Sequence, residues 1–164
     1  MKPLLVLLSV FIIGLLLRHF LKKQSISTST IGKTAMASML VFTGVAHFTF
    51  TEGMMAMFPN WVPMKEGLVY GTGILEVLGA VGLMLNKYSK ITAICLILFL
   101  VLALPLNVYA ALNYIDPQTG AVNGPGPNYL FFRIPLQLFF ILWIYLSALK
   151  SGTVESNFES NPEK

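Results

Sequence analysis

The sequence has few charged residues and a single cysteine. Asp, Glu, Lys and Arg make up 11% of its 164 residues, against roughly 25% in soluble domains. The lone Cys95 excludes an internal disulfide and a cysteine-based zinc site. The basic residues are scattered rather than clustered on one face, which argues against nucleic acid as a partner. The scarcity of charged residues and of cysteine therefore excludes most of the functions that soluble proteins perform.

Long apolar runs are abundant instead, since 55% of the residues are hydrophobic. A transmembrane helix needs about 20 mostly apolar residues. We expect such helices at residues 3–21, 34–50, 67–85, 91–112 and 129–149, the second being the most polar. The first is interpreted as a retained anchor, with a cleaved signal peptide as the alternative. The predicted fold is an all-α membrane protein, an antiparallel four-helix transmembrane bundle plus one additional N-terminal transmembrane helix.

The positions of the basic residues predict the orientation, because cytoplasmic loops carry an excess of Lys and Arg. One side of the membrane would receive Arg18, Lys22, Lys23, Lys33, Lys87, Lys90, Lys150 and Lys164. The other would receive only Lys2 and Lys65. We therefore expect a multi-pass protein of the cell membrane with its N-terminus outside and its C-terminus in the cytoplasm.

Three regions follow from this pattern. Residues 1–31 form an N-terminal anchor helix and a basic cytoplasmic loop, residues 32–150 the four-helix membrane domain, and residues 151–164 a disordered cytoplasmic tail. The outer loop at residues 51–66 is unusually apolar and either packs over the mouth of the bundle or anchors at the headgroups through Trp61. Gly67 and Gly71 are spaced for close helix packing or for local flexibility.

A few polar side chains are expected within the membrane, where ionisable groups are costly and need partners. They come from four segments and lie between the outer surface and the bilayer centre: His47, Glu76, Asn107, Arg133 and Gln137. Small residues three and four positions away indicate that they face other helices. They form either a pocket that binds or protonates a small molecule, such as a quinone-like headgroup, or a buried Glu76–Arg133 ion pair. Arg133 could also extend to the outer interface. No metal site is expected, because no second histidine lies at the depth of His47.

Four short sequence motifs together resemble those of the DoxX-like family of small integral membrane proteins. They are 45–48 (VAHF) followed by 57–63 (MFPNWVP), 73–80 (GILEVLGA), 104–107 (LPLN) and 132–137 (FRIPLQ). The resemblance implies a four-helix membrane bundle over residues 32–149. It also implies a link to redox chemistry, because the family is named for a small subunit of a thiosulfate:quinone oxidoreductase and other members are associated with thiol redox or oxidative stress.

Three functions follow as hypotheses. The first is a non-enzymatic subunit of a membrane redox or thiol-stress system, which would hold a redox protein partner and a quinone in the outer half of the bundle. The second is a membrane-embedded enzyme in which Glu76 and His47 perform acid–base chemistry on a lipophilic or quinone-like substrate. The third, a small-molecule carrier, is disfavoured because the polar groups are confined to one half of the membrane. Quinone is the one cofactor that these hypotheses suggest.

Overall fold

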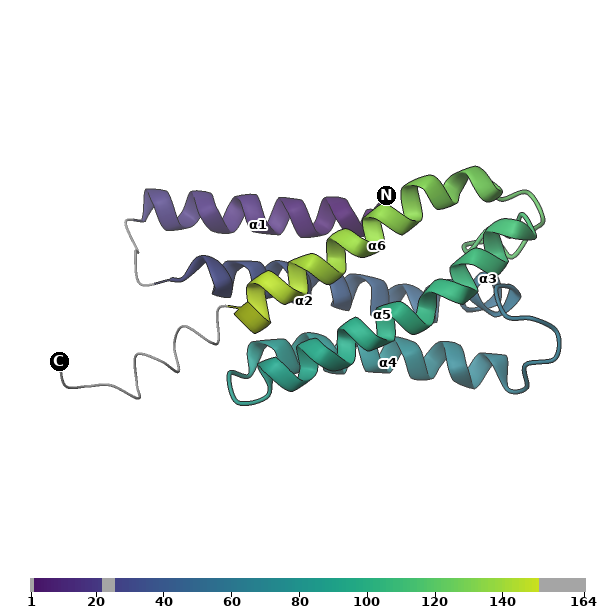
Figure 1. The fold of residues 1–164 in the computed structure, drawn as a ribbon, viewed down its shortest axis with the longest axis horizontal. Helices are drawn as coiled ribbons and strands as arrows, with labels where there is room; N and C mark the ends of the chain where they lie inside the picture. Colours follow the sequence, from purple (N-terminus) through teal and green to yellow (C-terminus); the bar gives the residue numbers. More distant parts are fainter. Residues whose placement is uncertain (1, 22–25, 151–164) are drawn as a thin grey trace.

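The computed structural model describes residues 2–21 and 26–150, within which the regular structure is helical and no strand occurs (Figure 1). The elements are α1 (Lys2–Phe20), α2 (Thr28–Thr49), α3 (Thr51–Ala56), α4 (Lys65–Met84), α5 (Ser89–Leu112), η1 (Pro127–Tyr129), α6 (Leu130–Ile144) and η2 (Tyr145–Lys150). The predicted disordered tail at 151–164 and the basic residues Lys22, Lys23 and Lys164 lie outside the described residues.

Within the described residues, four helical segments are long and apolar enough to cross a membrane: α1, α4, α5 and the continuous run from Pro127 to Lys150. They coincide with four of the five expected spans, and the coarse expectation of an all-α membrane protein is confirmed. Large apolar side chains cover their outer surfaces; in α1, for example, Ile12 and Ile13 are more than half exposed. Exposed aliphatic side chains on this scale suit lipid as the surrounding solvent.

The fifth expected span is α2, which is helical but too polar to qualify as a membrane span by composition. It begins at Thr28, earlier than predicted, because the side chain of Ser27 accepts a hydrogen bond from the backbone N–H of Thr30. Hydroxyl groups along α2 donate to the carbonyl four residues back, as Ser38 does to Thr34. Helix α2 packs between α1 and α4 and also contacts α6, which buries one of its faces, while Val41, Phe42 and Val45 on the other stay exposed.

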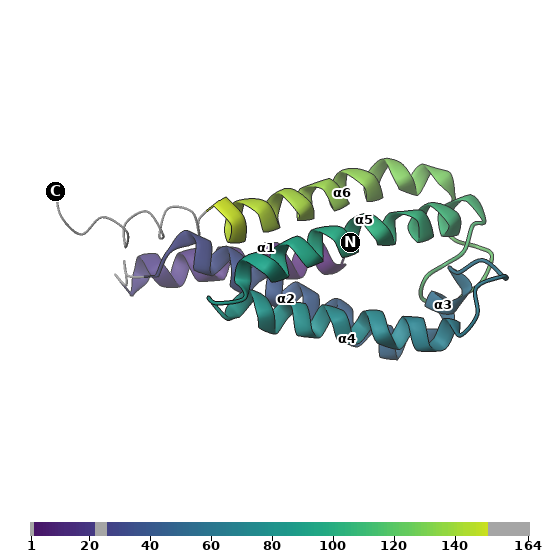
Figure 2. The same cartoon turned by 60° about the horizontal axis from the view of Figure 1, so that its bottom comes forward.

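Glycines set the distance between α2 and α4 and between α4 and α5. A Cβ atom on Gly73 of α4 would lie 3.0 Å from the carbonyl oxygen of Gly44 in α2, so the two backbones are almost in contact there. A Cβ on Gly79 would lie 2.7 Å from the side chain of Leu96 in α5. In Figure 2 the pair α5 and α6 lies close to α4 at the short α4–α5 turn and diverges from it toward α3.

Helix α1 shares the main hydrophobic core with the other helices. Leu7 is fully buried, and Phe11 meets Trp143 of α6 edge to face, with ring centroids 4.8 Å apart. Gly14 packs against Ile31 of α2. The division into an anchor and a four-helix domain stays a prediction, and its boundary between residues 31 and 32 lies inside α2.

The two ends of the molecule differ in chemistry. At one end, which we call the basic end, Lys33 of α2 contacts Asn86 of the α4–α5 turn at 3.5 Å. The Trp143 indole, near the end of α6, donates to the Gly32 carbonyl at 3.0 Å. At the other end, the α3 end, Gly53 of α3 is buried against the backbone of Pro117 in the loop between α5 and η1. Part of the predicted outer loop is thus a short helix held against that loop.

Candidate functional site

The five polar residues predicted to face inward lie on the side of each helix that is turned toward the other helices. In α4 the buried positions Val69, Gly73, Glu76, Ala80 and Leu83 follow one another at intervals of three and four residues, as one helix face requires. Glu76 is 9% exposed and Gln137 is 6% exposed. His47, Asn107 and Arg133 are half-buried.

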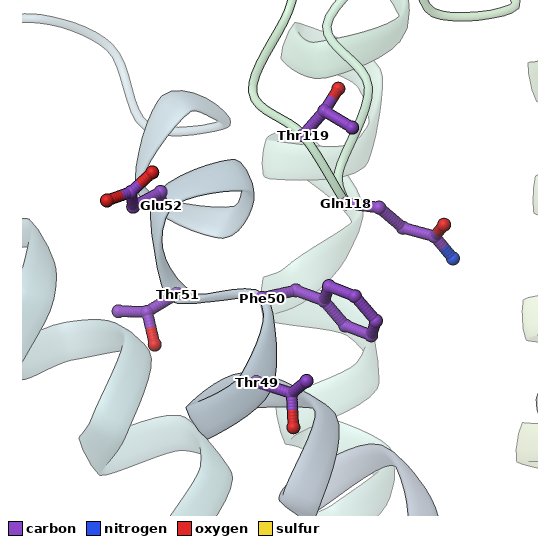
Figure 3. Close-up of a pocket in the computed structure, with 6 residues that line it drawn as sticks. All are labelled: Thr49, Phe50, Thr51, Glu52, Gln118 and Thr119. Carbon is purple, nitrogen blue, oxygen red and sulfur yellow. The ribbon is translucent and has the colours of Figure 1, made fainter.

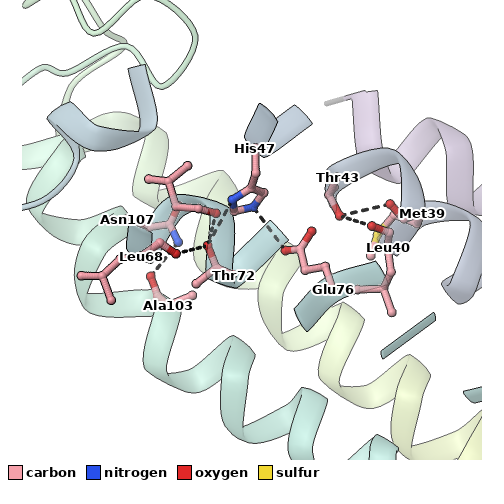
Figure 4. A network of polar contacts seen from close by, with 10 residues as sticks. Met39, Leu40, Thr43, His47, Leu68, Thr72, Glu76, Ala103 and Asn107 are labelled. Atoms are coloured by element: carbon pink, nitrogen blue, oxygen red, sulfur yellow. Dashed lines mark hydrogen bonds and ion pairs between the residues drawn. The ribbon is translucent and has the colours of Figure 1, made fainter. Parts of the chain in front are cut away.

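His47 of α2 and Glu76 of α4 form the centre of the candidate site (Figure 4). The Nε2 atom of His47 lies 3.6 Å from Oε1 of Glu76. The close approach of α2 and α4 at Gly44 and Gly73 brings the two side chains together, because a Cβ on Gly73 would lie only 2.8 Å from the Cβ of His47. The pair therefore depends on a backbone contact that side chains larger than hydrogen would prevent.

Thr72 is a third member of this site that the sequence analysis did not single out. Its Oγ1 lies 3.2 Å from Nδ1 of His47 and 2.9 Å from the carbonyl oxygens of both Leu68 and Val69 (Figure 4). Thr72 could have been identified from the sequence by its position four residues before Glu76, because this spacing places both residues on one helix face. The imidazole is thus held between a hydroxyl on one side and a carboxyl on the other.

The side chain of Glu76 makes no hydrogen bond with the described part of the chain. Its Oε1 is farther from His47 than the 2.7–3.2 Å or so of a hydrogen bond to nitrogen. Its Oε2 is shielded from solvent and has no hydrogen-bond partner. A buried polar group without a partner destabilises a protein by roughly 1–3 kcal/mol, and more if it is charged. A buried polar group without a partner calls for an explanation, and a functional role is one of them.

Arg133, Asn107 and Gln137 form a second group between α5 and α6. Nε of Arg133 donates to Oδ1 of Asn107 at 3.1 Å, and Nδ2 of Asn107 donates to the carbonyl of Ala103 at 2.8 Å. The side-chain amide of Gln137 donates to the Leu100 carbonyl. These bonds tie α6 to α5 and orient the guanidinium group.

The structure does not contain the Glu76–Arg133 ion pair that was one of the sequence alternatives. Among the described residues, Glu76 forms an ion-pair contact with His47, and the side-chain hydrogen bond of Arg133 goes to Asn107. The physical reason is the helix pairing: α2 and α4 approach each other at their glycines, whereas α5 and α6 meet through amide side chains. The five predicted residues therefore form two groups.

Two hollows lie outside these groups. One, of about 290 Å³, is at the α3 end and is lined by Thr49, Phe50, Thr51, Glu52, Gln118 and Thr119. Figure 3 shows that Glu52 and Gln118 point away from each other, and the Thr51 hydroxyl is bonded to the His47 carbonyl at 2.8 Å. The other, of about 430 Å³, is an apolar hollow along α5 around Pro105. Neither gathers convergent polar groups as the His47–Glu76 site does.

Most of the chain is similar to a known protein family. Residues 36–148, more than half of the chain, match a family described as a domain of unknown function (DUF8561). No curated protein and no solved structure matches the sequence. The matched range begins inside α2 and ends in η2, so it contains His47, Thr72, Glu76 and the Arg133 group.

Proposed function

The chain belongs to the family of the domain of unknown function DUF8561, and on that premise we propose that it is a ligand-binding integral membrane protein. It binds a small lipophilic molecule with a polar headgroup, a quinone or a related compound, at the His47–Glu76 site. In this role it serves as a non-enzymatic subunit of a membrane redox or thiol-stress system. The sequence motifs that resemble the DoxX-like family also support a role linked to redox chemistry.

The observation that carries the proposal is the Glu76 carboxyl, which contacts His47 at 3.6 Å and makes no hydrogen bond with the described residues. It is nine-tenths buried and its Oε2 has no hydrogen bond within the described residues. A ligand hydroxyl or N–H group would satisfy this oxygen and recover the cost of its burial. Apolar side chains line the same helix face, with Val69 and Ala80 on either side of Glu76. An apolar surface with one oriented polar group is typical of sites for lipophilic ligands.

Arg133 supports the same class of ligand. Only its Nε is used in a hydrogen bond to the described residues, so the Nη1 and Nη2 groups keep donors for a ligand carbonyl or phenolate oxygen. A hydroquinone offers hydroxyl donors that suit Glu76, and a quinone offers carbonyl acceptors that suit Arg133. The two groups lie on different helix pairs, and each supplies one kind of hydrogen bond.

For the placement in the membrane we propose an antiparallel bundle of α2, α4, α5 and α6 with α1 as an additional span. The N-terminus lies outside and the basic end faces the cytoplasm. The contacts of Lys33 with Asn86 and of Trp143 with Gly32 support this arrangement, because they gather the start of α2, the α4–α5 turn and the end of α6. The basic residues of the different loops then share one side, as the positive-inside rule requires.

The test compares the same change, glutamate to glutamine, at two positions of α4. Protein is extracted in mild detergent, and mass spectrometry identifies the bound lipophilic molecules. Wild type is expected to retain a quinone-like molecule, Glu76→Gln to lose most of it, and Glu66→Gln to behave as wild type, because Glu66 is exposed. Retention of only bulk phospholipid by the wild type would refute the proposal, as would equal retention by Glu76→Gln.

An enzyme is the second candidate, favoured by the contact between His47 and Glu76 at 3.6 Å. Such a pair could move a proton on and off a lipophilic substrate. Membranes incubated in D₂O with a total lipid extract would then show deuterium incorporated into one lipid species. His47→Ala and Glu76→Gln should each abolish the incorporation without loss of folded protein. Incorporation that persists in both variants would exclude acid–base catalysis by this pair.

A further inference from the structure

We propose that Thr72 is a positioning residue that holds His47 with a proton on Nδ1, so that Nε2 is the ring nitrogen that exchanges a proton with Glu76 or a ligand. The inference concerns the same site as the proposed function, but it holds whichever ligand binds there. It follows from the three contacts of the Thr72 hydroxyl and from the single contact of Glu76.

The first step concerns the one hydrogen of the Thr72 hydroxyl. Oγ1 lies 2.9 Å from the carbonyl oxygens of Leu68 and Val69, both of which can only accept. It lies farther, 3.2 Å, from Nδ1 of His47. A threonine within a helix commonly donates to the carbonyl of the preceding turn. When the hydrogen is used in this way, the lone pair of Oγ1 faces the imidazole, and Nδ1 must be the donor.

The second step concerns the far side of the ring. A neutral imidazole with its hydrogen on Nδ1 carries a lone pair on Nε2. Oε1 of an ionised carboxylate also carries only lone pairs, so the two atoms would repel each other at 3.6 Å. One proton between them removes the repulsion, either on Nε2 as an imidazolium–carboxylate pair or on Oε1 as two neutral groups. The net charge of the pair is zero in both arrangements.

The third step is that the backbone enforces this geometry. The near contact of α2 and α4 at Gly44 and Gly73 fixes the base of the His47 side chain beside α4. Thr72 immediately precedes Gly73, so its hydroxyl contacts the imidazole ring while it also stays hydrogen-bonded to the carbonyl of Leu68 in its own helix. Thr72 therefore determines that Nδ1, the ring nitrogen away from Glu76, carries the proton, and the free Oε2 stays available for a ligand.

The tautomer can be measured without a ligand. The chain has two histidines, and His19 is exposed near the end of α1, so His19→Gln leaves His47 as the sole reporter. ¹⁵N-histidine-labelled protein in lipid bilayers is examined by solid-state NMR, which separates protonated from bare ring nitrogens. We expect a protonated Nδ1 in the parent protein and in Thr72→Ser, which keeps the hydroxyl. In Thr72→Val, which has nearly the same shape but no hydroxyl, the fraction of protein with a protonated Nδ1 should fall at least twofold.

Two results would overturn the inference. One is a bare Nδ1 with a protonated Nε2 in the parent protein, which would mean that Thr72 donates to His47. The other is an unchanged protonated Nδ1 in folded Thr72→Val. The parent spectrum decides the question even if Thr72→Val does not fold. If Nδ1 is protonated as proposed but the extracted wild type retains no lipophilic molecule, the proposed function fails and the role of Thr72 stands.

Discussion

At the scale of single residues, glycines that lack a side chain are as important to the site as the polar residues. Gly44 and Gly73 allow the α2 and α4 backbones to approach, and this approach places His47 beside Glu76. Gly71 is only two positions from Gly73, yet no described atom outside its chain neighbours and its own helix backbone lies within 4 Å of where its Cβ would be. Glycine thus allows close helix packing at position 73, whereas at position 71 it faces open space.

Alanine substitutions at these two glycines should have opposite effects on stability. Gly73→Ala puts a Cβ 2.8 Å from the Cβ of His47 and is expected to destabilise the fold by about 1–3 kcal/mol, as overpacking does. Gly71→Ala is expected to be neutral or to stabilise the helix by up to about 1 kcal/mol. Thermal unfolding in detergent measures both. A Gly73→Ala variant as stable as wild type would contradict the close packing of α2 against α4.

At the scale of elements, the apolar segment between α2 and α4 divides into two parts with different surroundings. Helix α3 packs against the loop after α5, where Gly53 is buried. Farther along, Trp61 and Met64 are 82% and 83% exposed. Packing against the rest of the bundle thus describes α3, whereas anchoring at the headgroups stays a prediction for the stretch around Trp61.

Trp61 is expected to insert among the lipid headgroups, because an exposed indole at the end of a membrane bundle is stabilised there. Fluorescence of the protein in bilayers that contain brominated lipids tests this placement. The difference between wild type and Trp61→Phe isolates the signal of Trp61, since Trp143 is common to both. Quenching of that difference signal should be several-fold stronger for bromines near the headgroup than for bromines at the bilayer centre. A signal that no brominated lipid quenches would place Trp61 in water.

At the scale of the whole molecule, two helix pairs are joined at the basic end, α1 packs on α2 and α6, and α3 lies at the other end. α2 and α4 carry His47, Thr72 and Glu76, while α5 and α6 carry the Arg133 group. The contacts of Lys33 and Trp143 hold the basic end together. The two pairs diverge toward α3 (Figure 2), and His47, Asn107 and Arg133 lie within about five residues of the helix ends on that side.

The proposed orientation predicts which end reacts with an impermeant reagent. In a Cys95→Ser background, Asn123→Cys in the exposed loop at the α3 end should be labelled by a membrane-impermeant maleimide on intact cells. Lys87→Cys in the α4–α5 turn should be labelled only after permeabilisation. The reverse pattern would invert the orientation and place the candidate site in the cytoplasmic half of the membrane.

Much of the helical framework could be predicted from the sequence. Apolar runs of sufficient length predicted α1, α4, α5 and α6 within a few residues, because helix formation within a membrane satisfies every backbone hydrogen bond locally. The start of α2 could not be predicted as well, since it depends on the Ser27 cap rather than on hydrophobicity. The inward direction of the Glu76 and Gln137 side chains could be predicted from the spacing of the residues along each helix, because the period of a helix is fixed.

The sequence by itself determined that this chain builds apolar helices and that its few polar side chains face inward. Only the tertiary structure decided which of those side chains meet. Glu76 contacts His47 rather than Arg133, and Thr72 joins them, because the glycines of α2 and α4 bring these two helices closest together. Helical periodicity fixes the direction of a side chain, but the neighbour that it meets depends on how helices distant in sequence pack against each other.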